Sequence, residues 1–280
     1  MTRIADLQKK YPTIPLEVIV KWEILNTGVG DSDDLDKVSQ WLRRNNVGTY
    51  QTYDHDVTLK DQAVKRPERI KDGHMLRPNT MYMANGIGAK IRMDSRSPYR
   101  IKDRGDGRMA IFEGEDMVDM DVYFPPKPPL EEALTSKGTL VTDLVNLNQR
   151  CFFIVPVRYC EYFATGDQCK FCNFNGTQED AKSIGINRSV TISLDETVEA
   201  YKILGSDVKY PEGKLEMGGF MNSETEAKIY MDFVGALANA LPYKPSYNLV
   251  TQAMSRKNMQ RLKDVGLEAI ALQMEAFDPA

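Results

Sequence analysis

From residue 151 onward, the sequence alternates short apolar runs with longer segments of helical periodicity. The apolar runs have the length of strands and cover residues 152–159, 214–217, 247–251 and 268–274. The segments between them have apolar residues at helical spacing and cover residues 194–204, 224–241 and 256–265. Two of these segments begin with the sequence of a capping box, Ser193-Leu-Asp-Glu196 and Ser223-Glu-Thr-Glu226. A strand–helix–strand series of this kind predicts a parallel sheet with right-handed crossovers.

A proline-rich stretch at residues 125–129 separates this series from the first part of the chain. Residues 4–45 have the spacing of helices. Residues 109–124 instead have the polar–apolar alternation and the central turn residues of a β-hairpin. Because proline-rich segments form stiff, extended linkers, we expect an accessory α+β domain of unknown role over residues 1–129 and an α/β domain over residues 130–280.

Three of the four cysteines lie between the first expected strand of this series and its first expected helix. Cys160, Cys169 and Cys172 form a C-x8-C-x2-C arrangement. In parallel α/β folds, ligands and catalytic groups are found at the carboxyl ends of the strands. Cysteine thiolates are the standard ligands of [4Fe–4S] clusters, which normally take four of them. Three cysteines at this edge therefore predict a cluster with one iron open to a non-protein ligand.

The fourth cysteine, Cys151, leaves two alternatives open. It precedes Cys160 by nine positions, and at about 3.3 Å per residue a straight strand would place the two roughly 30 Å apart. We therefore expect Cys151 to be a buried core residue at the opposite edge of the sheet. A sharp bend at Pro156 would instead allow a four-cysteine electron-transfer or structural iron–sulfur site. The other alternative is a zinc-stabilised binding module, although both histidines, His55 and His74, lie upstream of the linker.

The cysteine arrangement resembles that of the radical S-adenosylmethionine superfamily, whose cluster loop reads C-x3-C-x-aromatic-C after the first strand of a partial (β/α)6 barrel. Cys169-Lys-Phe-Cys172 matches the second half of that motif, whereas the first gap holds eight residues instead of three. Met217-Gly-Gly-Phe220 is similar to the family's Gly-Gly-Glu motif, with Phe220 in place of the glutamate. Leu272-Gln-Met-Glu275 resembles a strand end of the biotin synthase and tyrosine lyase branch.

This resemblance implies a partial (β/α) barrel with parallel strands, of which about four of the six core strands are present, so that the chain ends within the barrel. It also implies an enzyme that cleaves S-adenosylmethionine reductively to a 5′-deoxyadenosyl radical, which abstracts hydrogen from an unknown substrate. The cluster ligands would be Cys160, Cys169 and Cys172. Phe171 would shield the cluster or line the adenine site, the backbone of Gly218 and Gly219 would meet the methionyl end, and Gln273 and Glu275 would face ribose, methionine or substrate.

Composition sets the expected partners and compartment. The chain has 36 Lys and Arg against 40 Asp and Glu, which is not the basic footprint of a nucleic-acid-binding protein. No segment has the apolar length of a signal peptide or a membrane span, so we expect a cytoplasmic protein that binds neither nucleic acid nor membrane. The resemblance further implies an electron donor such as a flavodoxin or ferredoxin, and a small-molecule or peptide substrate of unknown identity.

Overall fold

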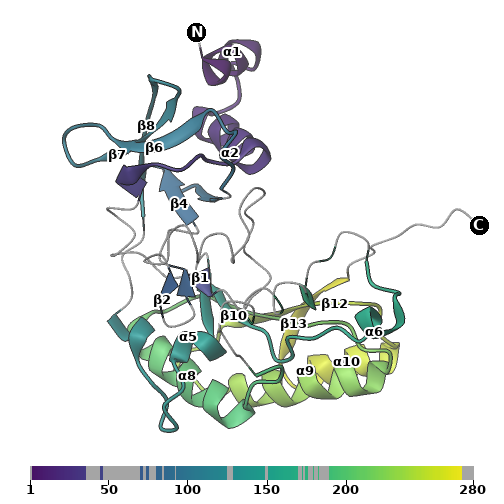
Figure 1. The fold of residues 1–280 in the computed structure, drawn as a ribbon. Coiled ribbons are helices and arrows are strands. Elements are labelled where there is room, and N and C mark those ends of the chain that lie inside the picture. The colour runs from purple at the N-terminus through teal and green to yellow at the C-terminus, as the bar shows by residue number, and fades with distance from the viewer. Residues whose placement is uncertain are drawn as a thin grey trace, which may run out of the picture. The chain divides into compact units, whose positions relative to one another are not determined.

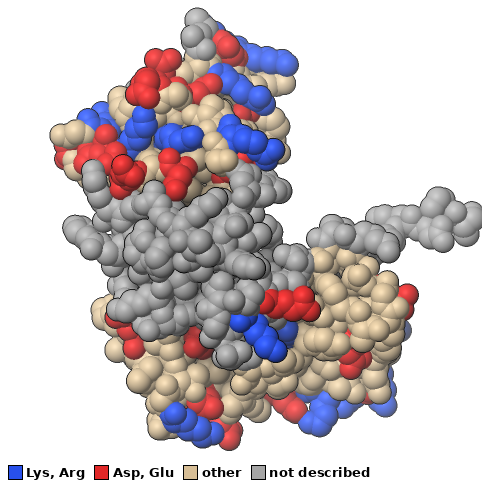
Figure 2. Space-filling view, viewed as in Figure 1, with Lys and Arg blue, Asp and Glu red and all other residues tan. Residues whose placement is uncertain are grey.

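The computed structural model divides the chain into two compact units, the first of Met1–Val47 and Gln51–Lys127, the second of Gly48–Tyr50 and Pro128–Ala280. The structure describes residues 2–35, 45–46, 70–71, 74–75, 80–83, 85–91, 93–124, 129–148, 151–169, 172, 174–175, 179, 182 and 189–272. Each unit has its own sheet and its own hydrophobic core (Figure 1). Acidic and basic side chains are interspersed over the visible face of each unit (Figure 2). No helix in the described ranges is long and apolar enough to cross a membrane.

The first unit combines two helices with an antiparallel sheet. The helices are α1 (Arg3–Lys10) and α2 (Leu16–Thr27). The sheet has the order β5-β4-β8-β7-β6 and consists of β4 (Thr80–Met83), β5 (Gly88–Lys90), β6 (Tyr99–Asp103), β7 (Met109–Glu113) and β8 (Asp116–Tyr123). A separate small sheet has the order β1-β3-β2 and consists of β1 (Asn45–Asn46), β2 (Ile70–Lys71) and β3 (His74–Met75).

Two sequence predictions for the first unit are confirmed. The helical start of the chain is present as α1 and α2, and the side chain of Thr2 caps α1. The hairpin predicted at residues 109–124 is formed by β7 and β8, which pair antiparallel around Gly114, a residue with a φ of 63°. Most of the third predicted helix, residues 36–44, lies outside the described residues. The core of the unit contains Val20, Ile24, Met81, Tyr99, Ile101 and Ile111, all buried.

The second unit has a sheet with three longer helices. The sheet has the order β13-β12-β11-β10-β9 and consists of β9 (Asn146–Asn148), β10 (Cys151–Ile154), β11 (Glu212–Glu216), β12 (Ser246–Thr251) and β13 (Leu267–Leu272). Strands β10 to β13 are parallel, and β9 pairs antiparallel with β10. The helices α8 (Leu194–Asp207), α9 (Ser223–Leu237) and α10 (Arg256–Asp264) connect the parallel strands and lie along one face of the sheet (Figure 1). The shorter elements are the 3-10 helix η2 (Pro129–Glu132), α5 (Val141–Leu144) and α6 (Tyr162–Thr165).

The α/β class predicted from the sequence is confirmed, and so is the alternation of parallel strands and helices after residue 151. The antiparallel strand β9 was not predicted, and it makes the sheet mixed. Among the described strands the sheet is open, with β13 at one edge and β9 at the other. The partial barrel therefore stays a prediction.

The core of the second unit lies between the sheet and its three longer helices. Phe152 of β10, Leu215 of β11 and Leu249 of β12 are fully buried against this layer. Two tyrosines place their hydroxyl groups inside it: those of Tyr201 and Tyr247 lie 2.9 Å apart, and Tyr247 also donates to the carbonyl of Leu237 at 2.8 Å. Because each buried hydroxyl has a partner, the tyrosines add apolar contact without an unpaired polar group.

The first parallel strand is shorter than predicted. The apolar run 152–159 suggested one continuous strand, but β10 ends at Ile154. Pro156 has no N–H to offer a sheet, and its carbonyl accepts from the N–H of Ile192 at 3.1 Å. The N–H of Arg158 donates to the carbonyl of Val190 at 2.7 Å. The chain after β10 thus leaves the sheet and pairs with the segment that precedes α8.

Candidate functional site

Cys160 lies beyond the carboxyl end of β10, directly before the short helix α6. Asn175 holds its peptide from both sides: Oδ1 accepts from the Cys160 N–H at 3.1 Å, and Nδ2 donates to the Cys160 carbonyl at 3.5 Å. An asparagine at position 173 or 175, just after the cysteines, can either form a local turn or contact sulfur or cofactor. In the structure the Asn175 amide fixes the backbone of a candidate ligand. Asn173 lies outside the described residues.

Cys169 and Cys172 form a tight turn, as their spacing suggests. The N–H of Cys172 donates to the carbonyl of Cys169 at 3.0 Å. Both residues, like Cys160, are in no disulfide and are of intermediate exposure. Cys160 and Cys172 pack against the same small apolar cluster, which is formed by Phe153, Val155 and Phe174. Within the described residues, no three His, Cys, Asp or Glu side chains are close enough together to hold a metal ion.

The fourth cysteine shares this apolar cluster with Cys160 and Cys172. Cys151 begins β10, and its side chain also packs against the cluster of Phe153 and Val155. The estimated separation from Cys160 assumed one continuous strand over residues 152–159, and that premise is wrong because β10 ends at Ile154. Burial, reinforced by the carboxylate of Glu212, raises the pKa of the Cys151 thiol to about 12. The neutral thiol is thereby favoured, whereas a metal ligand has to be a thiolate.

The glycine pair after β11 packs directly on the cysteine loop. A Cβ atom on Gly218 would lie 2.0 Å from the carbonyl oxygen of Tyr159 and 2.6 Å from the Cα of Cys160. A Cβ atom on Gly219 would lie 2.9 Å from the ring of Tyr162 and 3.8 Å from the Sγ of Cys160. The carbonyl of Gly219 accepts from the N–H of Glu161 at 3.0 Å. The protein's own packing is thus a sufficient reason for both glycines.

A buried hydrogen-bond network lies beside this contact. Glu226, from the first turn of α9, is 1 % exposed. The hydroxyl of Thr251 donates to its Oε1, and Gln252 donates Nε2 to its Oε2 at 2.5 Å. The N–H of Phe220 reaches the same Oε2 at 3.4 Å. The hydroxyl of Tyr162 donates to Gln252 Oε1 at 3.0 Å, and this bond links the network to α6.

Sequence reasoning missed Glu226 because it placed this residue in a capping box. The box predicted at Ser193 is confirmed at its N-cap, since that side chain accepts from the N–H of Glu196. The helix α9 is capped instead by Asn222, whose side chain accepts from the N–H of Glu224. Glu226 lies on the buried side of α9 with Tyr230 and Val234. Glu226 lies at helical spacing from the apolar residues Tyr230 and Val234, and this spacing was the signal that could have identified it.

Burial and hydrogen bonding act on Glu226 in opposite directions. Desolvation raises the pKa of its carboxyl above the ordinary value, while the hydrogen bonds from Thr251, Gln252 and the Phe220 N–H lower it. Thr251 ends β12 and Gln252 follows it, and polar residues at such a strand end can meet either solvent or a ligand. The structure shows both bonded to Glu226. They are neither free for solvent nor aimed at a vacant site.

The face of the sheet opposite the long helices carries charged side chains. Lys214 of β11 places its Nζ 3.6 Å from Glu216 Oε2 and 5.6 Å from the ring centre of Phe153. The side chain of Glu216 is 13 % exposed. Strand alternation places Glu216 on the same side as Lys214 and Gly218. Its carboxylate pairs with Lys214. This ion pair lies beside Phe153, which belongs to the apolar cluster that Cys160 and Cys172 contact.

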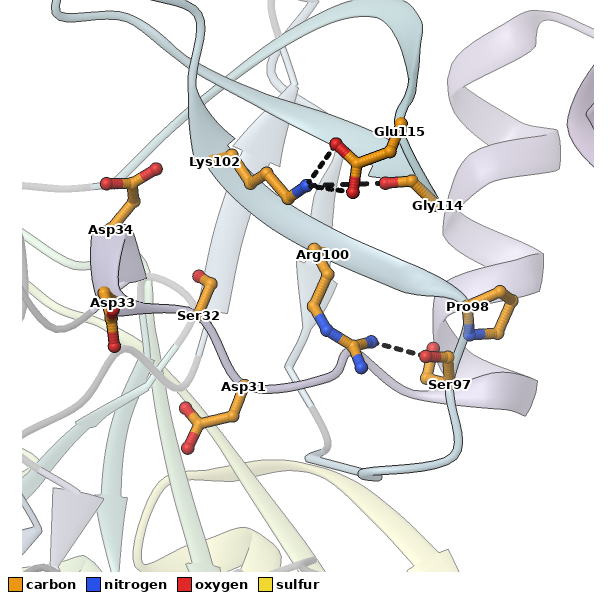
Figure 3. Close-up of a pocket in the computed structure, with 10 residues that line it drawn as sticks. All are labelled: Asp31, Ser32, Asp33, Asp34, Ser97, Pro98, Arg100, Lys102, Gly114 and Glu115. Atoms are coloured by element: carbon orange, nitrogen blue, oxygen red, sulfur yellow. Dashed lines mark hydrogen bonds and ion pairs between the residues drawn. The ribbon is translucent and has the colours of Figure 1, made fainter.

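The first unit has a separate hollow of about 610 Å³ beside β6 (Figure 3). It is lined by Asp31, Ser32, Asp33, Asp34, Ser97, Pro98, Arg100, Lys102, Gly114 and Glu115. Arg100 donates to the carbonyl oxygens of Ser97 and Tyr99. Lys102 places its Nζ 3.3 Å from both carboxylate oxygens of Glu115. Both cations are engaged by the unit itself, and no sequence motif pointed to this hollow.

The structure brings together part of the set of residues that the sequence singled out. Gly218 and Gly219 contact the cysteine loop at Cys160, and Cys172 shares an apolar cluster with Cys160. Phe171, Gln273 and Glu275 lie outside the described residues. No family model, no curated protein and no solved structure matches the chain. A functional assignment therefore depends on the residues and contacts of this chain.

Proposed function

We propose that this chain is a radical S-adenosylmethionine enzyme whose [4Fe–4S] cluster is held by Cys160, Cys169 and Cys172. The observation that carries the proposal is the contact between the Gly218–Gly219 turn and Cys160. The two motifs are far apart in the sequence, and each was singled out by its resemblance to a motif of that superfamily. They meet where the chain leaves β10 and β11, which are adjacent parallel strands. Ligand sites of parallel α/β folds lie at this edge.

The donor set suits an iron–sulfur cluster. Three cysteines that form no disulfide lie in one loop, and soft thiolate ligands favour iron–sulfur clusters over oxygen-binding metals. The side chains of Phe153, Val155 and Phe174 would keep water from a cluster bound beside Cys160 and Cys172. Since the three thiols do not form a metal-binding group among the described residues, the loop has to close around the metal as the cluster assembles.

Each part of the site then has a role that its chemistry supports. The three thiolates would hold the cluster, and S-adenosylmethionine would be its non-protein ligand. The chemistry that the bound cluster supplies is one electron for reductive cleavage of this cofactor, which yields a radical able to abstract hydrogen from substrate. The backbone of Gly218 and Gly219 meets the methionyl end. Phe171, Gln273 and Glu275 are proposed to contact the cluster, the cofactor or the substrate.

The fold supports the proposal at a coarser level. Strands β10, β11, β12 and β13 lie in sequence order in the sheet and are connected by α8, α9 and α10. Further strands added beyond β13 would continue the same right-handed series into a partial (β/α) barrel. An enzyme of this kind needs an external electron donor such as a flavodoxin or ferredoxin. A reducing cytoplasm is the compartment that would preserve its thiols.

Anaerobic reconstitution of the 280-residue chain tests the proposal. We expect about four iron and four sulfide per chain, as for a [4Fe–4S] cluster, and 5′-deoxyadenosine after reduction in the presence of S-adenosylmethionine. Cys160→Ala, Cys169→Ala and Cys172→Ala should each lose the cluster, whereas Cys151→Ala should retain it. A full cluster without any 5′-deoxyadenosine would contradict the proposal.

The same samples separate the two alternatives. Loss of the cluster in Cys151→Ala would establish a four-cysteine electron-transfer or structural site. A colourless anaerobic preparation that contains zinc, but neither iron nor sulfide, would establish a zinc-stabilised binding module.

A further inference from the structure

The turn after β11 is held by hydrogen bonds to both the carbonyl and the N–H of Phe220. The carbonyl of Phe220 accepts from Gln252 Nε2 at 2.6 Å and from the hydroxyl of Tyr162 at 3.3 Å. The N–H of Phe220 points to Glu226 Oε2 at 3.4 Å. The backbone on either side is also fixed, since Glu161 bonds the carbonyl of Gly219 and the N–H of Met221, at 3.0 Å and 2.8 Å. The turn is therefore clamped between α6 and the ends of α9 and β12.

Glu226 is an unexpected residue at the centre of this clamp. A buried carboxylate is costly unless it is paired or fully hydrogen-bonded. Within the described part of the chain, Glu226 has no basic partner, and its oxygens are occupied by Thr251, Gln252 and the Phe220 N–H. An apolar residue would suit the stripe that it shares with Tyr230 better. The carboxylate is therefore explained by the turn that it organises.

We infer that Glu226 and Gln252 are positioning residues that fix the Gly219–Phe220 backbone beside Cys160, and that this fixed backbone sets the affinity for S-adenosylmethionine. The inference rests on the proposed function, because it assigns this turn to the methionyl end of the cofactor. The two side chains bond the N–H and the carbonyl of Phe220. They act on ligand binding only through the backbone that they hold.

The first test needs no cofactor. Glu226→Gln replaces one acceptor oxygen with an NH2 group that faces another donor, so one hydrogen bond of the network is lost. We expect amide hydrogen exchange at residues 218–221 to become about tenfold faster, the effect of losing a bond of roughly 1.5 kcal/mol. Exchange within β11 should not change. Equal exchange in the two proteins would overturn the inference.

The matched control is Glu224→Gln in the same turn of α9. Glu224 is exposed, and its carboxylate lies 3.1 Å from Arg261 Nη1. This variant removes the same charge from the same helix terminus but leaves the clamp intact. It should exchange at residues 218–221 as the unchanged protein does. An equal acceleration in both variants would assign the effect to helix charge and would also overturn the inference.

The second test measures the cofactor. Reconstituted protein is reduced, titrated with S-adenosylmethionine and followed by the electron paramagnetic resonance signal of the cluster. In Glu226→Gln and Gln252→Ala, we expect unchanged iron and sulfide content and a half-maximal concentration raised about tenfold. Gln252 is only half-buried, so Gln252→Ala carries the test if Glu226→Gln fails to fold. An unshifted titration would overturn the inference.

The protein without substitutions distinguishes a failure of the proposed function from a failure of the positioning role. If its cluster signal does not respond to S-adenosylmethionine, the proposed function fails and the inference about affinity falls with it. The exchange experiment would then still decide whether Glu226 and Gln252 hold the turn. If the unchanged protein responds and Glu226→Gln responds identically, the proposed function stands and the positioning role alone is refuted.

Discussion

The backbone of Gly218 lies so close to Tyr159 that a Cβ atom on the glycine would stand 2.0 Å from the tyrosine carbonyl oxygen. The obstacle is main chain, so no change of rotamer relieves it. We expect Gly218→Ala to lower the free energy of unfolding by about 2–3 kcal/mol, the cost of forcing extra volume into a packed contact. Urea denaturation followed by circular dichroism measures this. An unchanged midpoint would mean that the turn does not pack on the cysteine loop.

Gly235 provides the control for this substitution. It lies inside α9, and the nearest atom to its Cβ position is the Cβ of Val265 at 3.9 Å. Alanine there meets no obstacle and favours the helix, so Gly235→Ala should raise the free energy of unfolding by about 0.5–1 kcal/mol. The opposite signs of the two substitutions separate steric conflict from a general effect of added methyl groups.

Local periodicity predicted the second unit well because each long helix covers one face of a parallel sheet. The buried stripe of α9, with Tyr230, Val234 and Leu237, follows from spacing alone. Strand β9 was missed because Asn146–Asn148 has little of the β-branched or aromatic character that marks a strand, and it is placed by pairing with β10. The end of β10 was missed because the apolar side chains continue to Val157. The backbone hydrogen bonds of the strand do not continue, since Pro156 has no N–H to donate.

The candidate site was predicted in part for a similar reason. Residue type and spacing identified Cys160 and the glycine pair without showing that they touch. Their contact depends on the pairing of β10 with β11, a long-range feature that no short motif contains. Glu226 escaped notice because a glutamate in the first turn of a helix has an ordinary surface explanation. Only the partners at Thr251 and Gln252 distinguish it.

The hydrogen-bonded tyrosine pair in the core predicts that Tyr247→Phe costs more stability than Tyr201→Phe. Because Tyr247 donates to the carbonyl of Leu237, Tyr201 is the donor in the bond between the two hydroxyls. Tyr247→Phe removes both bonds and leaves the Tyr201 hydroxyl unsatisfied, while the Leu237 carbonyl keeps the N–H of Ala240 at 3.0 Å. We therefore expect a cost of about 1.5–2 kcal/mol. Tyr201→Phe leaves the bond to Leu237 intact and should cost about 1 kcal/mol. Thermal and urea unfolding measure the two values, and the reverse order would contradict the network.

The buried thiol of Cys151 predicts a loss of stability at alkaline pH. Its pKa rises from 9.0 to about 12, chiefly through burial. Because the folded value is the higher one, the stabilisation is complete below about pH 9 and is lost as the pH rises toward the folded value. Between about pH 8 and pH 10.5, the unchanged protein should therefore lose more stability than Cys151→Ala. Urea denaturation of the metal-free, reduced protein measures the difference.

The comparison with Cys151→Ala removes the effect of other groups that titrate in the same range. Tyr247, whose pKa burial raises to about 12, is present in both proteins and contributes equally to both. A difference that stays constant with pH would show that Cys151 is not desolvated in the folded state. It would also reopen the possibility that this thiol serves as a fourth ligand.

The two hydrogen bonds from Asn175 to the backbone of Cys160 predict that this side chain limits the reactivity of the Cys160 thiol. Its amide bonds both the N–H and the carbonyl of that residue, at 3.1 Å and 3.5 Å. Asn175→Ala removes both bonds, so we expect Cys160 in the metal-free protein to be alkylated about three- to tenfold faster, as for the loss of about 1 kcal/mol of local order. Asn175→Asp keeps the acceptor of the shorter bond and should stay close to the unchanged rate. Mass spectrometry of the labelled peptide measures both rates. Equal labelling of the alanine variant and the unchanged protein would show that this pair of bonds does not order the loop.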